Sequence, residues 1–430
     1  MTTPLTDVSR LPVHDVMCID CKSFYASTEA IRRGEFPLAA KIAVMSNEES
    51  QGGLILAASP ATKKNYGVQL GTRRYQIADE MDIEMVEPRM ADYIKKNYII
   101  NRIYRQFTDD QHWYPYSVDE SFIDVTHSHE VFGTTDEIAA RIQEAVFEKT
   151  GIITTIGIGP NPLLAKLALD NEAKRAEPWR ATWTYERVPE TVWQIDELTS
   201  FWSIGSKTAK KLNELGITTI KELAHADRQR LHRKFGVLGD ALYFHAWGID
   251  YSDLGQPYLP REENRGYNNS QVLMRDYTEQ TEIETVLSEI ADQVGARLRS
   301  HQQQASIVGI FVGFAVPDEQ GQHGFSARTQ ITPTNHTEDL IQAVRSLFER
   351  KWRRQTLRNL GVSVSGISDA TVLQFNLFED SHRQEADLAL DRTIDQIRQR
   401  YGYQALVRGY SKTKGATAIK RSGLVGGHHG

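Results

Sequence analysis

The sequence predicts an α+β protein of several domains, and three observations carry this prediction. Its 430 residues exceed one ordinary hydrophobic core and indicate about two to four domains. Hydrophobic residues make up 40% and charged residues 25% of the chain, as in globular proteins. Strand-like and helix-like stretches alternate up to about residue 190, whereas residues 191–250 have the pattern of short helices alone.

The first part of the chain reads as a sheet domain that is interrupted by a small insert at about 27–89. Helical spacing of apolar residues predicts a helix at 138–148, and β-branched residues predict a strand at 152–158. Pro162 is favoured in the first turn of a helix and predicts a helix at 162–172. Three further segments read as strands: 13–21, 113–118 and 122–125.

A second α+β unit is predicted beyond a linker. A glycine, two prolines and a cluster of charges indicate the linker at 254–265. The second unit spans residues 266–375, and a tail follows from residue 379. Its predicted helices are 282–302 and 337–354, and its predicted strands are 306–314, 329–332 and 360–365.

The composition also bears on compartment and cysteine chemistry. No apolar run approaches the roughly 20 residues that span a bilayer, and residues 1–11 lack a secretory signal, so we expect a cytosolic protein. Cys18 and Cys21 have the spacing of a redox pair or half a zinc site, but a structural zinc site needs about four ligands. Residues three apart on a strand point to opposite faces, so we expect two structural thiols.

Basic residues gather locally although the net charge is −6. Residues 396–430 contain no Asp or Glu, and such patches attract phosphate backbones whatever the charge of the whole chain. We expect this tail to contact DNA or a partner, although each patch could be an ordinary solvated face. A second basic cluster comprises Arg345, Arg350, Lys351, Arg353, Arg354 and Arg358.

Two adjacent carboxylates, Asp119 and Glu120, lie between the strand-like residues 113–118 and 122–125, which read as the arms of a hairpin. Adjacent negative charges on rigid backbone are costly unless a cation binds there. Asp20 lies on a third predicted strand, and three carboxylates on strands are a scaffold for paired Mg²⁺ ions in phosphoryl transfer. An isolated Asp-Glu pair could equally be a solvated turn, so the choice depends on the other motifs.

Aromatic and basic residues beside these carboxylates suit a nucleotide. Tyr25 could lie under a sugar and exclude a 2′-hydroxyl group, although with Phe24 it could instead be core packing. Lys166 follows a Gly-Pro-Asn turn on a predicted helix, where it can neutralise the charge of a leaving pyrophosphate. Lys63 and Lys64 are further phosphate candidates, and each lysine could also be surface charge.

Two more motifs suit DNA and a protein partner. Residues 201–217 predict two helices joined by an Ile-Gly-Ser turn, whose backbone N–H groups at Gly205 and nearby Lys207 suit a DNA phosphate. This pattern resembles the helix-hairpin-helix motif, and the alternative is an ordinary helix connection. Residues 374–378, Gln-Phe-Asn-Leu-Phe, resemble the pentapeptide by which bacterial polymerases hold the sliding clamp, and the alternative is a last core strand. Its side chains for partner pockets are Gln374, Leu377 and Phe378.

Three motifs together resemble those of the Y-family of translesion DNA polymerases. They are Tyr-Ser-Val-Asp-Glu-Ser at 116–121, Asp20 with Phe24 and Tyr25, and Gly-Pro-Asn with Lys166. The resemblance runs from about residue 13 to the tail and is greatest for the UmuC-like catalytic subunit of SOS polymerase V, in its Gram-positive form. It implies a ferredoxin-like palm with a small fingers insert, an all-helical thumb with the helix-hairpin-helix motif, and an α+β little finger. The implied boundaries are palm 1–26 and 90–190, fingers 27–89, thumb 191–253, linker 254–265, little finger 266–375, clamp-binding peptide 374–378 and basic tail 379–430.

The resemblance also implies the metal and nucleotide residues. Two Mg²⁺ ions would be bound by Asp20, Asp119 and Glu120, and the backbone carbonyl of Cys21 would complete one coordination sphere. Tyr25 would be the steric gate beside Phe24, and Lys166 and Lys64 would hold the triphosphate. Archaeal relatives carry a Tyr in the fingers where this chain has Ala61, so Lys63 stays an alternative to Lys64. Ala57 would cover the nascent base pair, and DNA would contact Gly205, Lys207, Arg350, Arg353 and Arg354.

The implied activity is error-prone translesion synthesis, in which deoxynucleotides are added to a primer 3′-OH by two-Mg²⁺ phosphoryl transfer without proofreading, in SOS-type damage tolerance. The implied partners are primer–template DNA, dNTPs and the sliding clamp, with a UmuD′-like protein and a recombinase filament as further candidates. A non-catalytic clamp- and DNA-binding accessory protein is one alternative, which the three carboxylates and Lys166 argue against. A metal-dependent nuclease is the other, and it leaves Tyr25 unexplained.

Overall fold

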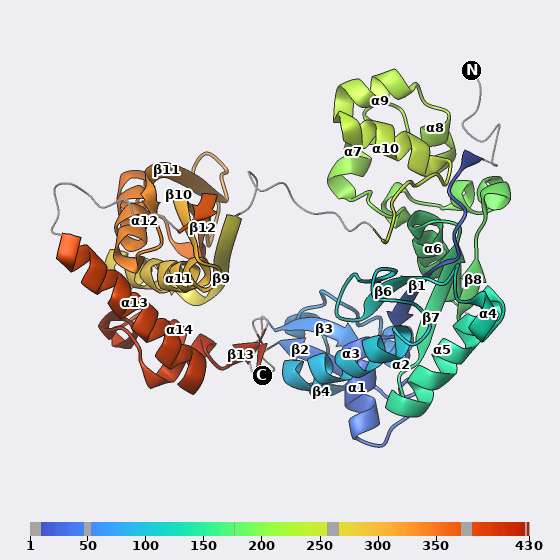
Figure 1. The fold of residues 1–430 in the computed structure, drawn as a ribbon, viewed down its shortest axis with the longest axis horizontal. Coiled ribbons are helices and arrows are strands. Elements are labelled where there is room, and N and C mark those ends of the chain that lie inside the picture. Colours follow the sequence, from blue (N-terminus) through green and yellow to red (C-terminus); the bar gives the residue numbers. More distant parts are fainter. Residues whose placement is uncertain are drawn as a thin grey trace. The chain divides into compact units, whose positions relative to one another are not determined.

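The computed structural model describes residues 10–46, 53–175, 177–255, 266–370, 381–425 and 428–429. The chain divides into two compact units, Met1–Pro257 with His428–Gly430, and Tyr258–Gly427 (Figure 1). Across these described stretches, no helix is long and apolar enough to cross a membrane.

A five-stranded sheet is the centre of the first unit. Its strands are β1 (Val16–Cys21), β5 (Trp113–Pro115), β6 (Glu120–Asp124), β7 (Thr154–Gly159) and β8 (Arg180–Thr182). They lie in the order β5-β6-β1-β7-β8, with β1 antiparallel to both of its neighbours and β7 parallel to β8. The hairpin predicted around Asp119 is therefore confirmed as the antiparallel pair of β5 and β6.

Helices cover both faces of this sheet. They are α3 (Met90–Tyr104), α4 (His129–Phe132), α5 (Thr135–Thr150) and α6 (Pro162–Ala168), which continues into a π-helical turn (Leu169–Ala173). Because side chains alternate along a strand, Cys18 packs on the α6 face and Cys21 on the α3 and α5 face. Both thiols are free and buried, as expected.

A three-stranded sheet forms the insert between α1 (Phe24–Arg32) and α3. Its order is β3-β2-β4, and β2 is antiparallel to β3 but parallel to β4. Its elements are β2 (Ile42–Ser46), β3 (Leu54–Ala58), α2 (Pro60–Tyr66), a 3₁₀ turn (Arg74–Gln76) and β4 (Glu84–Val86). Ser59 caps α2 by accepting a hydrogen bond from Thr62 N.

Short helices follow the central sheet, as predicted for residues 191–250. Three 3₁₀ segments (Tyr185–Glu190, Val192–Gln194 and Leu198–Ser200) lead into α7 (Ser206–Asn213), α8 (Ile220–Ala224), α9 (Arg228–Phe235) and α10 (Val237–Ala246). Their apolar residues share one hydrophobic core with α6, so these helices and the sheet are packed together within the first unit.

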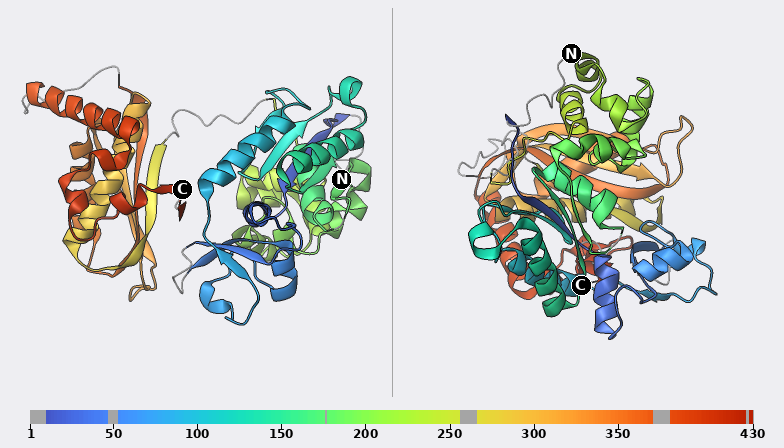
Figure 2. Two further views of the ribbon diagram at one scale, coloured as in Figure 1. Left: turned by 90° about the horizontal axis from the view of Figure 1, so that it is seen from below. Right: turned by 90° about the vertical axis from the view of Figure 1, so that its right-hand side faces the viewer.

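The second unit has a four-stranded antiparallel sheet in the order β11-β10-β12-β9. Its elements are β9 (Gly266–Tyr277), α11 (Gln280–Ser300), β10 (Gln303–Phe314), β11 (Gly324–Thr334), α12 (Thr337–Lys351) and β12 (Leu357–Asp369). The two helices and the inner side chains of the strands form one core, and the helices lie on one side of the sheet (Figure 2). The sequence reading missed β9, an edge strand rich in Asn, Ser and Gln.

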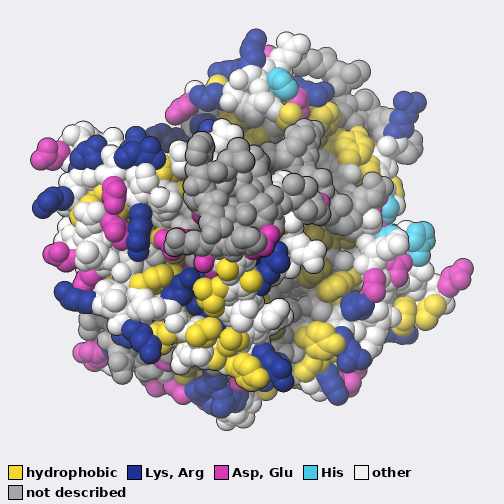
Figure 3. Space-filling model, turned by 60° about the vertical axis from the view of Figure 1, so that its left-hand side comes forward, with side chains coloured by type: hydrophobic (Ala, Val, Ile, Leu, Met, Phe, Trp, Pro, Cys, Tyr) yellow, Lys and Arg dark blue, Asp and Glu magenta, His cyan; other side chains and the backbone are white. Residues whose placement is uncertain are grey.

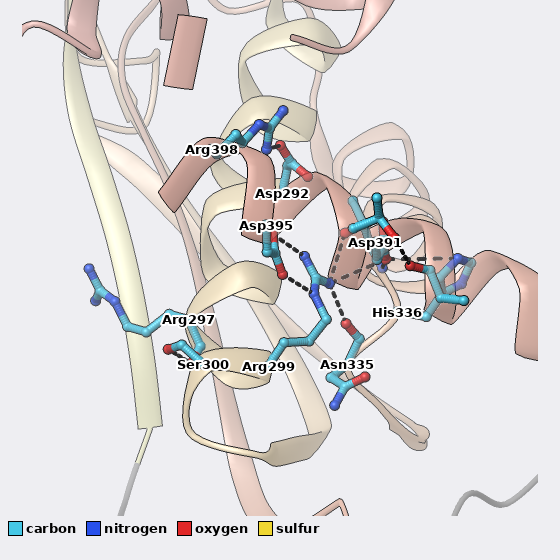
Figure 4. A network of polar contacts seen from close by, with 12 residues as sticks. Asp292, Arg297, Arg299, Ser300, Asn335, His336, Asp391, Asp395 and Arg398 are labelled. Atoms are coloured by element: carbon cyan, nitrogen blue, oxygen red, sulfur yellow. Dashed lines mark hydrogen bonds and ion pairs between the residues drawn. The ribbon is translucent and has the colours of Figure 1, made fainter. Parts of the chain in front are cut away.

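The C-terminal segment also folds, and within the second unit it packs against α11. It contains α13 (Ser381–Tyr401), two 3₁₀ turns (Tyr403–Ala405 and Gly409–Lys412), α14 (Ala418–Arg421) and the short strand β13 (Leu424–Val425). The short strand β14 (His428–His429) is counted with the first unit. Arg299 of α11 lies 2.6 Å from Asp395 and 3.2 Å from Asp391, both on α13 (Figure 4). Arg398 pairs with Asp292 of α11 at 2.7 Å.

These ion pairs change the interpretation of the basic tail. Asp292 is also 3.0 Å from Arg408, and Glu282 is 3.1 Å from Lys414. Several basic residues of the tail therefore neutralise buried carboxylates of α11, which reduces the charge left for DNA. The face in Figure 3 has Lys and Arg side chains mixed with Asp and Glu instead of one continuous basic field.

Candidate active site

The three predicted carboxylates meet at one end of the central sheet. Asp20 of β1 is directly opposite Glu120 of β6 in the antiparallel register. Cys21 N donates to Asp119 O at 2.9 Å, so the backbone of Cys21 lies beside the Asp119 turn. Ser117 shapes this turn, because its hydroxyl accepts from Glu120 N (3.0 Å) and donates to the Asp119 carboxylate (2.7 Å).

The electrostatics of Asp20 show that these carboxylates lie close together. Burial raises the pKa of Asp20 to about 6; Lys174 opposes the rise, while Asp119 and Glu120 add to it. Carboxylates that repel each other in this way favour a bound hard cation with oxygen ligands, such as Mg²⁺. The donor set therefore fits the divalent metal that a resemblance to polymerases implies.

Two lysines are the present cation partners of this carboxylate group. Lys166 Nζ lies 2.8 Å from Glu120 Oε2, and its side chain is only 8% exposed. Lys174 Nζ lies 3.2 Å from Asp20 Oδ2 with 34% of its side chain exposed. Within the described ranges, no three His, Cys, Asp or Glu side chains already form a group that could hold a metal ion.

Tyr25 stands beside the carboxylates at the start of α1. Its ring stacks on Tyr93 with centroids 4.4 Å apart, and the Tyr93 hydroxyl donates to the buried Glu29 at 2.9 Å. Burial, and then the charge of Asp119, raise the pKa of Tyr25. The ring is also packed in the small core that includes Ala57 of the insert. Phe24, in contrast, is buried in the sheet core.

A group of lysines borders Asp20 from three elements. Lys63 of α2 donates to Ser23 Oγ at 2.9 Å. Burial lowers the pKa of Lys63, the charge of Asp20 opposes this shift, and the charge of Lys174 adds to it. Lys22 lies 3.6 Å above the Trp179 ring and donates to the backbone of Lys174 at 3.0 Å. Lys63 and Lys64 are both exposed on α2, and Lys63 is the one that contacts Ser23 and senses the charge of Asp20.

Lys174, Asp170 and Cys18 are not among the predicted site residues, and Cys18 is predicted only as a structural thiol. Lys174 is closer to the open side of the site than Lys166, which is buried behind Glu120. Asp170 contacts both lysines, and Cys18 Sγ donates to Glu120 Oε1 at 3.1 Å. The repeated four-residue spacing of 166, 170 and 174 was a signal that could have identified this group.

The predicted DNA-contact residues lie on exposed segments of both units. Gly205 precedes α7 with no side-chain cap, so the first N–H groups of that helix are not satisfied by a side chain, and Lys207 is exposed in its first turn. Arg350, Arg353 and Arg354 are exposed at the end of α12 and in the loop after it. Gln374, Leu377 and Phe378 lie outside the described residues.

Comparisons with known proteins agree with this architecture. Models of the impB/mucB/samB family match residues 19–170, those of its C-terminal domain match 266–377, and those of the IMS family HHH motif match 185–217. A solved structure named "Y-family DNA polymerase chimera Dbh-Dpo4(243-245)-Dbh" has a TM-score of 0.65 at 20% identity, covering 83% of this chain and 99% of that one. At that identity it supports the fold.

Sequence relatives cover nearly the whole chain. A Bacillus subtilis (strain 168) protein whose name includes "UV-damage repair protein UvrX" is 37% identical over 99% of this chain and 100% of that protein. "DNA polymerase IV 2" of the same organism is 34% identical over 96% of this chain and 98% of that protein. "DNA polymerase IV" of Moorella thermoacetica is 33% identical over 93% and 96%, respectively. The chain therefore belongs to the impB/mucB/samB family and is a Y-family translesion DNA polymerase of DNA damage repair, which acts on DNA and dNTPs and depends on a divalent metal.

Proposed function

We propose that Asp20, Asp119 and Glu120 hold two Mg²⁺ ions, with the Cys21 carbonyl as a further ligand, for error-prone synthesis without proofreading. The observation that carries this proposal is the convergence of the three carboxylates at one sheet end. When bound, the ions would activate the primer 3′-OH and neutralise the triphosphate. Magnesium-dependent extension of a primer on damaged and undamaged templates, with dNTP omitted as the control, tests it.

The domain boundaries expected from the sequence are part of the same proposal. The five-stranded sheet would be the palm (1–26 and 90–190), and the small sheet of the insert would be the fingers (27–89). Helices α7 to α10 would be the thumb (191–253), and the sheet of the second unit the little finger (266–375). The C-terminal segment after residue 380 would extend the little finger, because its ion pairs are with α11.

Lys174 is the lysine that we assign to the triphosphate, together with Lys63 and Lys22. Lys174 is partly exposed beside Asp20, while Lys166 is buried against Glu120, so Lys166 is better suited to position that carboxylate. Lys64 stays a candidate from the sequence alone. Three ammonium groups around the open side of the carboxylates suit a polyanion.

We expect Lys174→Ala to raise the KM for dNTP by about tenfold or more, as for the loss of one charge-assisted hydrogen bond. Steady-state primer extension at saturating DNA measures this effect. Lys95→Ala is the matched control, because Lys95 is an exposed lysine on α3. An unchanged KM in folded Lys174→Ala protein would remove this lysine from the triphosphate site.

We expect Tyr25→Ala to admit ribonucleotides, because the proposed gate would place the Tyr25 ring, which stacks on Tyr93, where a 2′-hydroxyl needs space. The ratio of kcat/KM for dNTP to that for the matching rNTP should fall by about a hundredfold, which corresponds to a lost discrimination of about 3 kcal/mol. Tyr25→Phe keeps the ring and should keep the ratio. If Tyr25→Ala still rejects ribonucleotides, the gate assignment is wrong.

Two surfaces support the proposed DNA contacts. The uncapped start of α7 offers N–H groups for a phosphate. On the outer face of the second sheet, small side chains line an open groove of about 570 Å³, among them Ser270, Gly309, Ser326 and Ser363, together with Arg328. A Cβ at Gly309 would lie 2.7 Å from Ser363 Oγ, so a larger residue there would displace this hydroxyl.

The sliding clamp, a UmuD′-like protein and a recombinase filament are proposed partners on sequence grounds alone. The Gln-Phe-Asn-Leu-Phe peptide at 374–378 supports the clamp. Replacement of Gln374, Leu377 and Phe378 by Ala should abolish clamp-stimulated extension and leave extension without clamp unchanged.

A further inference from the structure

A row of alternating charges links two of the proposed metal carboxylates. Lys166 Nζ lies 2.8 Å from Glu120 Oε2 and 2.9 Å from Asp170 Oδ2. Lys174 Nζ lies 2.9 Å from Asp170 Oδ1 and 3.2 Å from Asp20 Oδ2. Asp170 is therefore the shared anion between two ammonium groups, each of which contacts a different carboxylate of the site.

The local backbone sets this arrangement. Lys166 is on α6, and Asp170 lies in the π-helical turn Leu169–Ala173. Lys174 N donates to Leu169 O, five residues back, at 3.1 Å. Such a turn interrupts the regular α-helical spacing and often occurs at functional sites. The turn brings Lys174 from the end of the helix toward Asp20.

Lys166 and Lys174 differ in burial, and this difference suits them to different roles. The Lys166 side chain is 8% exposed and is enclosed by its two carboxylates. Lys174 is 34% exposed and Asp170 is 33% exposed, so both border the open side. Lys174 can thus exchange Asp20 for a phosphate oxygen while it keeps its contact with Asp170.

We propose that Asp170 is a positioning residue for nucleotide binding, which holds Lys174 at the triphosphate and shares the charge of Lys166 with Glu120. This proposal rests on the assignment of Lys174 to the triphosphate. Without the Asp170 charge, Lys174 would have Asp20 as its remaining carboxylate partner in this row, and Lys166 would have Glu120. Both pairings would compete with the cation that these carboxylates bind.

The test is Asp170→Asn, which removes the charge and keeps the size of the side chain. We expect the KM for dNTP to rise about tenfold, because the nucleotide would lose the binding energy of about one charge-assisted hydrogen bond. The change in kcat should be smaller. We also expect a smaller dNTP-induced rise in Tm for the complex with a dideoxy-terminated primer–template in Ca²⁺. Asp170→Glu restores the charge and should recover part of both effects.

Asp136→Asn is the matched control, since it removes a carboxylate from an exposed ion pair with Arg180 (3.0 Å) and should change neither readout. If Asp170 had a purely structural role, Asp170→Asn would lower the Tm of the protein without ligand. It would then change kcat and KM to a similar extent, instead of changing mainly the KM. If folded Asp170→Asn protein binds dNTP as the unaltered protein does, the proposal is wrong.

A comparison of Asp170→Asn with Lys174→Ala separates this proposal from the assignment on which it rests. If Lys174→Ala raises the KM and Asp170→Asn does not, the positioning role fails while the triphosphate assignment stands. If neither variant changes the KM, the assignment of Lys174 itself fails. Asp170→Asn added to Lys174→Ala should raise the KM no further, because both changes act through the same ammonium group.

Discussion

Asp119→Ala should abolish primer extension while the protein remains folded. Asp119 lies at the tip of the β5–β6 hairpin, where its carboxylate accepts a hydrogen bond from the Ser117 hydroxyl. Because this partner is a hydroxyl and not a buried lysine, removal of the Asp119 carboxylate leaves no unpaired charge there. The loss of one metal ligand removes several kcal/mol of charge stabilisation, which lowers the single-turnover rate by about a thousandfold or more.

The measurement is single-turnover extension of a labelled primer in Mg²⁺, with Tm as the check on folding. Asp110→Ala is the matched control, because Asp110 is exposed near the same hairpin and pairs with Arg105 at 2.5 Å. Full extension by folded Asp119→Ala protein would show that Asp119 is not a metal ligand. Primer shortening by the unaltered protein would instead support nuclease chemistry.

Asp292→Ala should cause the largest loss of stability among the variants considered. Asp292 is 1% exposed and pairs with Arg398 and Arg408 from the C-terminal segment. The Arg398 side chain is 9% exposed, so removal of Asp292 leaves an uncompensated buried cation. Breaking such a pair costs about 3–5 kcal/mol of unfolding free energy.

Urea unfolding of the full chain measures this loss. Asp276→Ala is the control, because Asp276 forms an exposed pair with Arg358 at 2.9 Å in the same unit and should lose at most about 1 kcal/mol. Replacement of both Asp292 and Arg398 by Leu should recover much of the stability. Equal losses in Asp292→Ala and Asp276→Ala would contradict a structural role for the C-terminal segment.

Much of the central sheet could be predicted because its signals are local. The β-branched pattern of residues 152–158 and the hairpin arms around Asp119 appear as β7, β5 and β6. The edge strand β9 could not be recognised, since its Asn, Ser and Gln residues have low strand propensity. Its conformation depends on pairing with β12, almost one hundred residues later in the chain.

The lysines of the site were likewise only partly predictable from local sequence signals. Spacing placed Lys166 on the helix after Gly-Pro-Asn, and that helix begins at Pro162 as expected. The direction of the side chain depends on the register that puts Asp20 opposite Glu120, and on the π-helical turn after α6. Neither feature has a local sequence signal, so the four-residue spacing of 166, 170 and 174 alone does not tell which lysine faces the open side.

By itself, the sequence determined the family, the three carboxylates and the aromatic residue beside them, because these are short motifs whose residue types state their chemistry. Only the tertiary structure decided which lysine faces the open side of the site, and that the basic tail neutralises α11. Both outcomes depend on ion pairs between residues far apart in the chain, as in Lys174 with Asp20 and Arg398 with Asp292. Such pairs form only when folding brings these residues together, and the loss of one partner of a buried pair leaves an uncompensated charge.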